Sequence, residues 1–198
     1  MHGEWTSDQH TPEVDRNELA RALREHAYLE GDFVLRSGRR SSYYLDKYRF
    51  ETQPDVLGAL GAAIAEAARE IEPSAARLAG PELGAVALAA AASLASGLPF
   101  LIVRKEAKGY GTAQRLEGAF EEGELVCLVE DVVTSGGAAV AAVEALREAA
   151  LDVRTAVCIV DREEGGDEAL AGVGVRLHPL FRVSELAKVS KRAAKPHG

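Results

Sequence analysis

Short apolar segments alternate with longer segments of helical periodicity through most of the chain. The strand-like segments are 77–79, 100–103, 125–129 and 153–160, and 173–177 has the pattern of an edge strand. Three further segments have the length and apolar spacing of helices, namely 54–71, 84–96 and 138–149. Strands separated by helices favour a parallel sheet with helices on both faces. The predicted fold class is therefore α/β, with ligands bound at the carboxyl ends of the strands.

The two ends of the chain depart from this alternation. A capping-box spacing begins at Asp15 and is followed by apolar residues at helical spacing, which predicts a first helix. Two short apolar segments, 33–35 and 43–45, flank the polar turn 37–40 and predict a hairpin. Residues 183–189 have the pattern of a final helix.

Composition and charge restrict the class of protein. The 198 residues are 47% hydrophobic, which suits a normal globular core, and the net charge of −8 disfavours general binding to nucleic acid. No apolar run is long enough to cross a membrane, and the N-terminus lacks the pattern of a signal peptide. Cys127 and Cys158 lie in strand-like runs, which favours buried reduced thiols over a disulfide. These features predict a cytoplasmic protein.

The most specific chemistry lies where the strand at 125–129 ends. Glu130 and Asp131 follow the apolar run, and a turn rich in hydroxyls and glycine, 134–138, precedes the next helix. Unpaired N–H groups at a helix start, together with a tight glycine turn, can hold a phosphate. Carboxylates instead accept hydrogen bonds from neutral hydroxyls such as those of a ribose. The Lys of a Walker P-loop and the dinucleotide fingerprint are both absent. The segment predicts a site for a phosphorylated sugar.

A second candidate segment, 104–112, follows the strand at 100–103. It contains Arg104, Lys105 and Lys108 and two glycines, with little apolar content, so we expect a mobile loop. Taken alone, such a segment is typical of a solvated surface loop. Beside a phosphosugar site, cations on a closable loop are what a pyrophosphate leaving group needs.

These motifs resemble those of the type I phosphoribosyltransferases, and among them the orotate phosphoribosyltransferase family. Residues 129–137 are similar to the motif that binds phosphoribosyl pyrophosphate (PRPP), and 104–112 resembles the catalytic loop. The resemblance covers about 17–190 and implies a single domain over 15–190, with a hood mainly at 15–50 and a core at 51–182. Residues 1–14 are expected to form a flexible arm and 191–198 a basic tail.

The resemblance implies roles for individual residues. Catalysis would depend on Lys108, Arg104, Lys105 and Asp131. Orotate would contact Tyr43, Tyr44, Thr134 and Arg162, the last through a guanidinium fork on the carboxylate. Mg²⁺ would be held mainly by PRPP and water rather than by protein ligands. The PRPP-binding residues would be Arg36, Arg104, Lys105, Lys108, Tyr110, Glu130, Asp131, Val132, Val133, Thr134, Ser135, Gly136, Gly137 and Ala138.

The same resemblance implies a homodimer in which the 104–112 loop is shared between subunits. The expected reaction transfers phosphoribose from PRPP to orotate, giving orotidine 5′-monophosphate and pyrophosphate in pyrimidine biosynthesis. Two alternatives remain open at this point. A phosphoribosyltransferase for another nucleobase would have no need of the cation at Arg162. A catalytically inactive PRPP-sensing regulator is favoured by Tyr110, which stands where the family usually has His and has an ordinary pKa of about 10.

Overall fold

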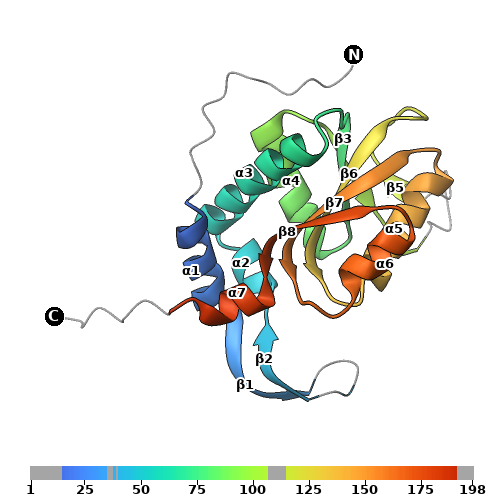
Figure 1. Cartoon of the computed structure of the whole chain (residues 1–198). Helices are drawn as coiled ribbons and strands as arrows, with labels where there is room; N and C mark the ends of the chain where they lie inside the picture. The colour runs from blue at the N-terminus through green and yellow to red at the C-terminus, as the bar shows by residue number, and fades with distance from the viewer. Residues whose placement is uncertain (1–14, 35–37, 39, 107–114, 191–198) are drawn as a thin grey trace.

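The computed structural model describes residues 15–34, 38, 40–106 and 115–190 (Figure 1). The predicted arm at 1–14 and tail at 191–198 lie outside the described residues, as do Arg36, Lys108 and Tyr110. Within the described parts of the chain, no helix is both long and apolar enough to span a membrane.

The centre of the molecule is a mostly parallel sheet. Its order in the described residues is β5-β4-β3-β6-β7-β8, and only the short β5 runs antiparallel to its neighbour. The sequence pattern therefore predicted the fold class correctly. The strands are β3 (Arg77–Pro81), β4 (Phe100–Val103), β5 (Leu116–Glu117), β6 (Leu125–Val133), β7 (Asp152–Asp161) and β8 (Arg176–Arg182).

Helices cover both faces of this sheet (Figure 1). On one face α3 (Pro54–Ile71) and α4 (Gly84–Ser96) pack with α1 (Arg16–His26), and on the other α5 (Gly137–Glu148) packs near α6 (Gly166–Gly172). Alternate residues of β6 join the two cores: Cys127 belongs to the first and Leu128 to the second. Cys127 and Cys158 are both buried free thiols, as predicted.

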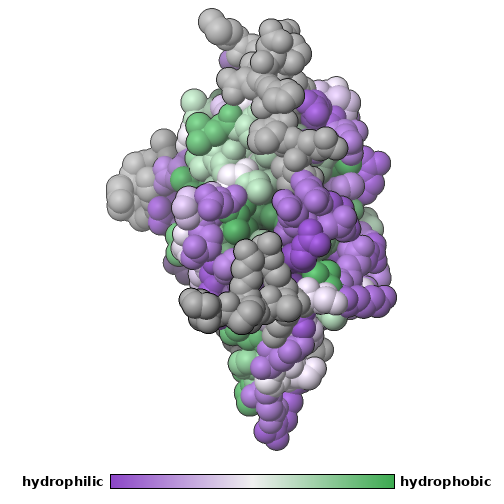
Figure 2. Space-filling view, turned by 90° about the vertical axis from the view of Figure 1, so that its left-hand side faces the viewer, coloured by the Kyte–Doolittle hydropathy of each residue, from purple (hydrophilic) through white to green (hydrophobic). Residues whose placement is uncertain are grey.

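A separate hairpin projects from the body of the molecule (Figures 1 and 2). It consists of β1 (Tyr28–Val34) and β2 (Arg40–Leu45), and is followed by the short α2 (Tyr48–Glu51). Asp15 caps α1 by accepting from the N–H of Asn17 at 2.8 Å, as the capping spacing predicted. The last helix, α7 (Val183–Lys188), packs beside α1. Figure 2 shows hydrophilic residues over much of the α1 side, with hydrophobic residues in the hollow between them.

Several predicted boundaries were wrong. The strand expected at 173–177 begins only at Arg176 and ends at Arg182, because α6 occupies the preceding residues and Gly174 turns the chain at φ +72°. β6 does not end at Val129 but runs through both acids to Val133. The hairpin strands are longer than 33–35 and 43–45, and α2, β5 and α6 were not predicted at all.

Candidate active site

Four parallel strands bring the predicted site residues to one edge of the sheet. β3 ends at the turn that leads into α4, β4 ends just before Arg104, β6 ends at the turn 134–136, and β7 ends just before Arg162. Because these strands run parallel and are neighbours, their carboxyl ends lie together. The sequence spacing thus predicted a common location for segments that are up to 80 residues apart.

The turn after β6 has the backbone needed for an anion site. Gly136 has φ +80° and lies directly before α5, and a Cβ there would approach the Gly166 carbonyl oxygen to 3.0 Å. No side chain among the described residues caps the start of α5, so its first N–H groups remain available. Ser135, Gly137 and Ala138 are exposed and Thr134 is half-buried. The turn can hold a phosphate with main-chain donors and hydroxyls.

The acid pair lies within the last part of β6 and is buried. Asp131 is 4% exposed and Glu130 is 6% exposed. The Asp131 carboxylate accepts a hydrogen bond from the ammonium of Lys47, which comes from the segment between β2 and α2. Sequence analysis missed Lys47, because it belongs to no motif and meets Asp131 only through the fold. Asp131 is therefore charge-compensated in the unliganded protein.

Glu130 has a strongly altered environment. Burial, and to a lesser degree the charge of Asp131, raise its pKa to about 8, although Lys47 opposes the shift. Its Oε1 atom has no hydrogen-bond partner among the described residues. Glu51, on α2, is also buried, and its pKa is raised to about 7 by burial and by Asp131. A carboxyl group that is protonated near neutral pH can donate as well as accept a hydrogen bond.

Glu130 makes the stability of the unliganded protein depend on pH. Because its folded pKa of about 8 lies above the ordinary glutamate value of 4.5, its contribution to stability is fully present below about pH 4.5. That contribution is lost as the pH rises through the folded pKa, and Glu51 adds a loss in the lower part of the same window. We expect the melting temperature to fall between about pH 4.5 and 8, and Glu130→Gln to flatten that fall.

Thermal melts of the two proteins in matched buffers test this expectation. Glu144→Gln is the control, because Glu144 is exposed and lies in the second half of α5, away from its N-terminal turn. If Glu130→Gln and Glu144→Gln follow the same pH profile, Glu130 does not carry the effect.

The cationic loop begins beside the turn after β3. The Lys105 N–H donates to the Glu82 carboxylate at 2.8 Å, and the Arg104 N–H donates to the Arg115 carbonyl at 2.7 Å. The Arg104 guanidinium lies 3.6 Å from Glu117, and its side chain is one-third exposed. Glu82 and Leu83 are joined by a cis peptide bond. The structure thus places Arg104 and Lys105 at the site edge, whereas Lys108 lies outside the described residues.

Tyr43 and Arg162 meet between the hairpin and the sheet. The Arg162 guanidinium lies over the Tyr43 ring at 5.2 Å from its centroid, and its Nε donates to the Tyr43 hydroxyl at 3.4 Å. The Tyr43 ring also stacks on the ring of Tyr28, with 5.0 Å between the two centroids. Arg162 also pairs with Glu164 at 2.9 Å. A planar anion could displace Glu164 from the guanidinium and lie near an aromatic ring.

Tyr44 lies elsewhere than its neighbour. Its ring contacts Phe33 on the hairpin at 5.7 Å between centroids, and the residue is 44% exposed. Successive residues of a strand point to opposite faces, so Tyr43 and Tyr44 do not face Arg162 together in this conformation. A role for Tyr44 in binding orotate stays a prediction.

The described residues offer little for direct metal binding. They contain no cluster of three or more His, Cys, Asp or Glu side chains that could hold a metal ion. Asp131 is engaged by Lys47, and burial holds Glu130 largely in its neutral form at neutral pH. The donor set therefore fits a cation that arrives with a ligand and keeps its waters, with the acid pair accepting from those waters.

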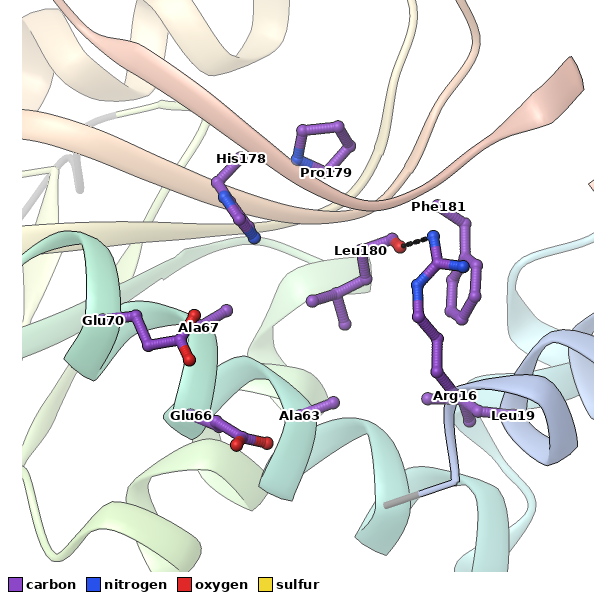
Figure 3. A pocket seen from close by; sticks show the side chains of 10 residues that line it. All are labelled: Arg16, Leu19, Ala63, Glu66, Ala67, Glu70, His178, Pro179, Leu180 and Phe181. Carbon is purple, nitrogen blue, oxygen red and sulfur yellow. Dashed lines mark hydrogen bonds between the residues drawn. The ribbon is translucent and has the colours of Figure 1, made fainter. Parts of the chain in front are cut away.

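A separate cavity of about 390 Å³ lies between α1, α3 and β8 (Figure 3). Its cation, Arg16, is already used: it lies 4.6 Å from the Phe181 ring centroid and donates to the Leu180 carbonyl at 3.0 Å. Glu66 and Glu70 project toward the cavity from α3. Two carboxylates and an engaged arginine do not suit a polyanion, so this cavity is not a candidate for the phosphosugar.

Comparison with known proteins identifies the family. No protein-family model matches the chain. An orotate phosphoribosyltransferase of Methanocella arvoryzae is 49% identical over 170 residues, which cover 85% of this chain and 95% of that protein. The crystal structure of the Aeropyrum pernix orotate phosphoribosyltransferase has a TM-score of 0.78 and 35% identity, covering 86% of this chain and 96% of the other. The Mycobacterium tuberculosis enzyme in complex with PRPP has a TM-score of 0.74 and 29% identity, covering 87% and 99%. Since identity and coverage are this high over nearly the whole length, the chain belongs to the orotate phosphoribosyltransferase family.

Proposed function

We propose that the chain transfers phosphoribose from PRPP to orotate, giving orotidine 5′-monophosphate and pyrophosphate. One observation carries the proposal: three features lie at the same edge of the sheet. They are a buried acid pair, a turn with uncapped helix N–H groups that can hold a phosphate, and an arginine over an aromatic ring. The similar proteins reported above are named for this reaction, which supports the proposal. A different nucleobase, or a regulator without catalysis, is not favoured by those relatives.

The proposed roles follow from the geometry of the β6 end. Main-chain N–H groups and hydroxyls of 134–138 would hold the 5-phosphate, with Val132 and Val133 supplying the adjoining backbone. Glu130 and Asp131 would accept or exchange hydrogen bonds with the ribose hydroxyls. This arrangement would fix the sugar while the bond from C1′ to the diphosphate breaks, the diphosphate leaving with the electron pair.

Bond formation occurs as the diphosphate departs. N1 of orotate attacks C1′ through a transition state of oxocarbenium character, as in other displacements at an anomeric carbon. The N1 proton passes to the departing diphosphate or to water. Orotate is already anionic, so a strong enzymic base is not required, and Tyr110 in place of His is compatible with catalysis on this reading.

The cations of the second loop would stabilise the leaving group. Arg104 and Lys105 lie at the site edge, and with Lys108 they would close over the developing negative charge of pyrophosphate. Arg36 and Tyr110 are proposed as further PRPP contacts from the sequence alone. Mg²⁺ would be held mainly by PRPP and water and would neutralise charge on the diphosphate.

The proposed orotate site lies at Tyr43 and Arg162, with Thr134 and Tyr44 as additional contacts. The Arg162 side chain is 12% exposed, so a carboxylate bound there would be largely shielded from water. A carboxylate bound there would compete with Glu164, which lies 2.9 Å from the guanidinium.

We also propose a cytoplasmic homodimer that shares the 104–112 loop. α4 carries an apolar face that its own chain does not cover: Leu83, at the start of the helix, is 69% exposed and Leu94 is 84% exposed. Half-buried residues at 86, 87 and 90 lie between them at helical spacing. A second copy of the chain would bury this face and bring its loop toward the site.

Arg162→Met tests the orotate assignment. In the unaltered protein, the ultraviolet absorbance of orotate should fall when PRPP and Mg²⁺ are added, and uracil should give no product. In Arg162→Met, the KM for orotate should rise roughly tenfold or more, because a shielded charge-assisted contact is lost, while the KM for PRPP changes little. The assay is initial-rate kinetics with each substrate varied.

Arg154→Met is the matched control, since Arg154 is on the same strand but is 64% exposed and pairs with Asp152. It should leave both constants near those of the unaltered protein. An orotate KM that does not move in Arg162→Met would remove Arg162 from the base site.

A further inference from the structure

Lys47 lies where the hairpin region meets the catalytic edge. It is the cap residue of α2, and its ammonium reaches across to the carboxylate of Asp131, 84 positions later in the chain. The Lys47 side chain is 33% exposed, whereas that of Asp131 is 6% exposed. An ammonium has three N–H donors, and the contact with Asp131 uses one. The ammonium also lies 5.4 Å from the centroid of the Tyr48 ring, and its other N–H donors can meet a ligand at the mouth of the site.

The start of α4 closes around the same contact. A Cβ on Gly84 would overlap the Asp131 carboxylate and would approach the Lys47 Nζ to 2.6 Å. Glycine at the first position of α4 thus lets the helix start approach the ion pair. Within the described residues, no side chain caps this helix. An ammonium and the positive end of a helix dipole lie side by side, an arrangement that negative charge stabilises.

Nearby carboxyl groups do not compete strongly for the ammonium. Glu51 and Glu130 are buried, and burial is the main cause that raises the pKa of each, to about 7 and about 8. Each has an oxygen without a hydrogen-bond partner among the described residues. At pH 7 Glu130 is therefore mostly protonated and Glu51 about half protonated, and the charges of Lys47 and Asp131 offset each other. The cluster thus repels a polyanion less than its three carboxyl groups would if all were ionised, although the whole chain has a net charge of −8.

The position of Lys47 selects one part of the substrate. The 5-phosphate turn lies at the start of α5, on the other side of the acid pair from α4. Lys47 instead lies beside the turn from β3 to α4, whose Glu82 accepts from the Lys105 N–H at the start of the cationic loop. The cations of that loop are those proposed to hold the leaving group.

We propose that Lys47 is a PRPP-binding residue that donates to the 1-diphosphate while it keeps its contact with Asp131. This inference rests on the proposed function. Lys47 thereby links recognition of the ribose hydroxyls, through Asp131, to recognition of the leaving group. Its ammonium also assists departure of the diphosphate by compensating the negative charge that develops there.

Binding of inorganic pyrophosphate and of ribose 5-phosphate separates this role from a merely structural one. Calorimetric titrations with each probe, in the presence of Mg²⁺, compare the unaltered protein with Lys47→Met and Lys47→Arg. We expect Lys47→Met to weaken pyrophosphate binding at least about fivefold and ribose 5-phosphate binding less than about twofold. Lys47→Arg, which keeps the charge, should restore most of the pyrophosphate affinity. In kinetics, the KM for PRPP should rise in Lys47→Met and that for orotate should not.

Lys188→Met is the matched control for the loss of one positive charge, because Lys188 lies exposed at the end of α7. Circular dichroism confirms folding, and Lys47→Gln repeats the comparison if Lys47→Met is unfolded. If both probes weaken equally in Lys47→Met, Lys47 acts only by placing Asp131, and the inference is wrong. Unchanged pyrophosphate binding also overturns it. If the unaltered protein binds neither probe, the proposed function itself fails.

Discussion

Asp131→Asn is expected to lower kcat/KM for PRPP roughly 10²- to 10³-fold, the range seen when one preorganised polar contact to a transition state is removed. The side chain is buried at the end of β6 and is held there by Lys47, so its geometry is set before the substrate arrives. Asparagine keeps one acceptor oxygen but loses the negative charge that, in the proposed reaction, would face an oxocarbenium-like sugar. It also leaves the Lys47 ammonium without its counter-ion. Steady-state kinetics at saturating orotate measure the effect.

The control for this variant is Asp152→Asn, the same change at the opposite end of the neighbouring strand, β7. Asp152 pairs with Arg154 at 2.5 Å and is well removed from the carboxyl edge of the sheet. It should leave kcat/KM within about twofold, as surface substitutions generally do. Melting temperatures of both variants show whether a loss of activity follows from unfolding. An Asp131→Asn enzyme with nearly normal turnover would mean that Asp131 does not contact the ribose.

The core of the site could be predicted because its signals are local in sequence. An apolar run, two acids and a glycine turn occupy one strand–turn–helix unit, and that unit determines its own geometry. Parallel strands then bring Arg104 and Arg162 to the same edge through a rule of topology, without any specific contact being known. Predictions of this kind depend on periodicity and on strand ends, which the sequence specifies well.

Lys47 could not be found in this way. Its contact with Asp131 depends on how the hairpin region packs against α4 and β6, and no spacing within the sequence encodes that packing. The elevated pKa of Glu130 has the same origin, because burial of that carboxyl group is a property of the assembled fold. The error at 173–177 has a different origin. The apolar residues there fit a strand pattern, but 173–175 lie in the turn that follows α6, where Gly174 has a positive φ.

A pair of glycine substitutions in α3 is expected to give the largest difference in stability. Gly61 packs directly on α4: a Cβ there would lie 2.6 Å from the Ala91 Cβ and 2.7 Å from its carbonyl carbon. Because the obstructing atoms include backbone, α3 and α4 must move apart, and Gly61→Ala should lose about 1–3 kcal/mol in the free energy of unfolding. Urea unfolding followed by circular dichroism measures the change.

Gly58→Ala is the matched variant, one turn earlier in the same helix. A Cβ at Gly58 meets no atom of the described residues within 4 Å, and the position is exposed. Alanine is favoured over glycine in a helix, so Gly58→Ala should gain about 0.5–1 kcal/mol. The two variants should therefore differ by about 1.5–4 kcal/mol although the substitution is the same. If Gly61→Ala were as stable as Gly58→Ala, helix propensity alone would account for both, and close contact between α3 and α4 would not be the reason for glycine at 61.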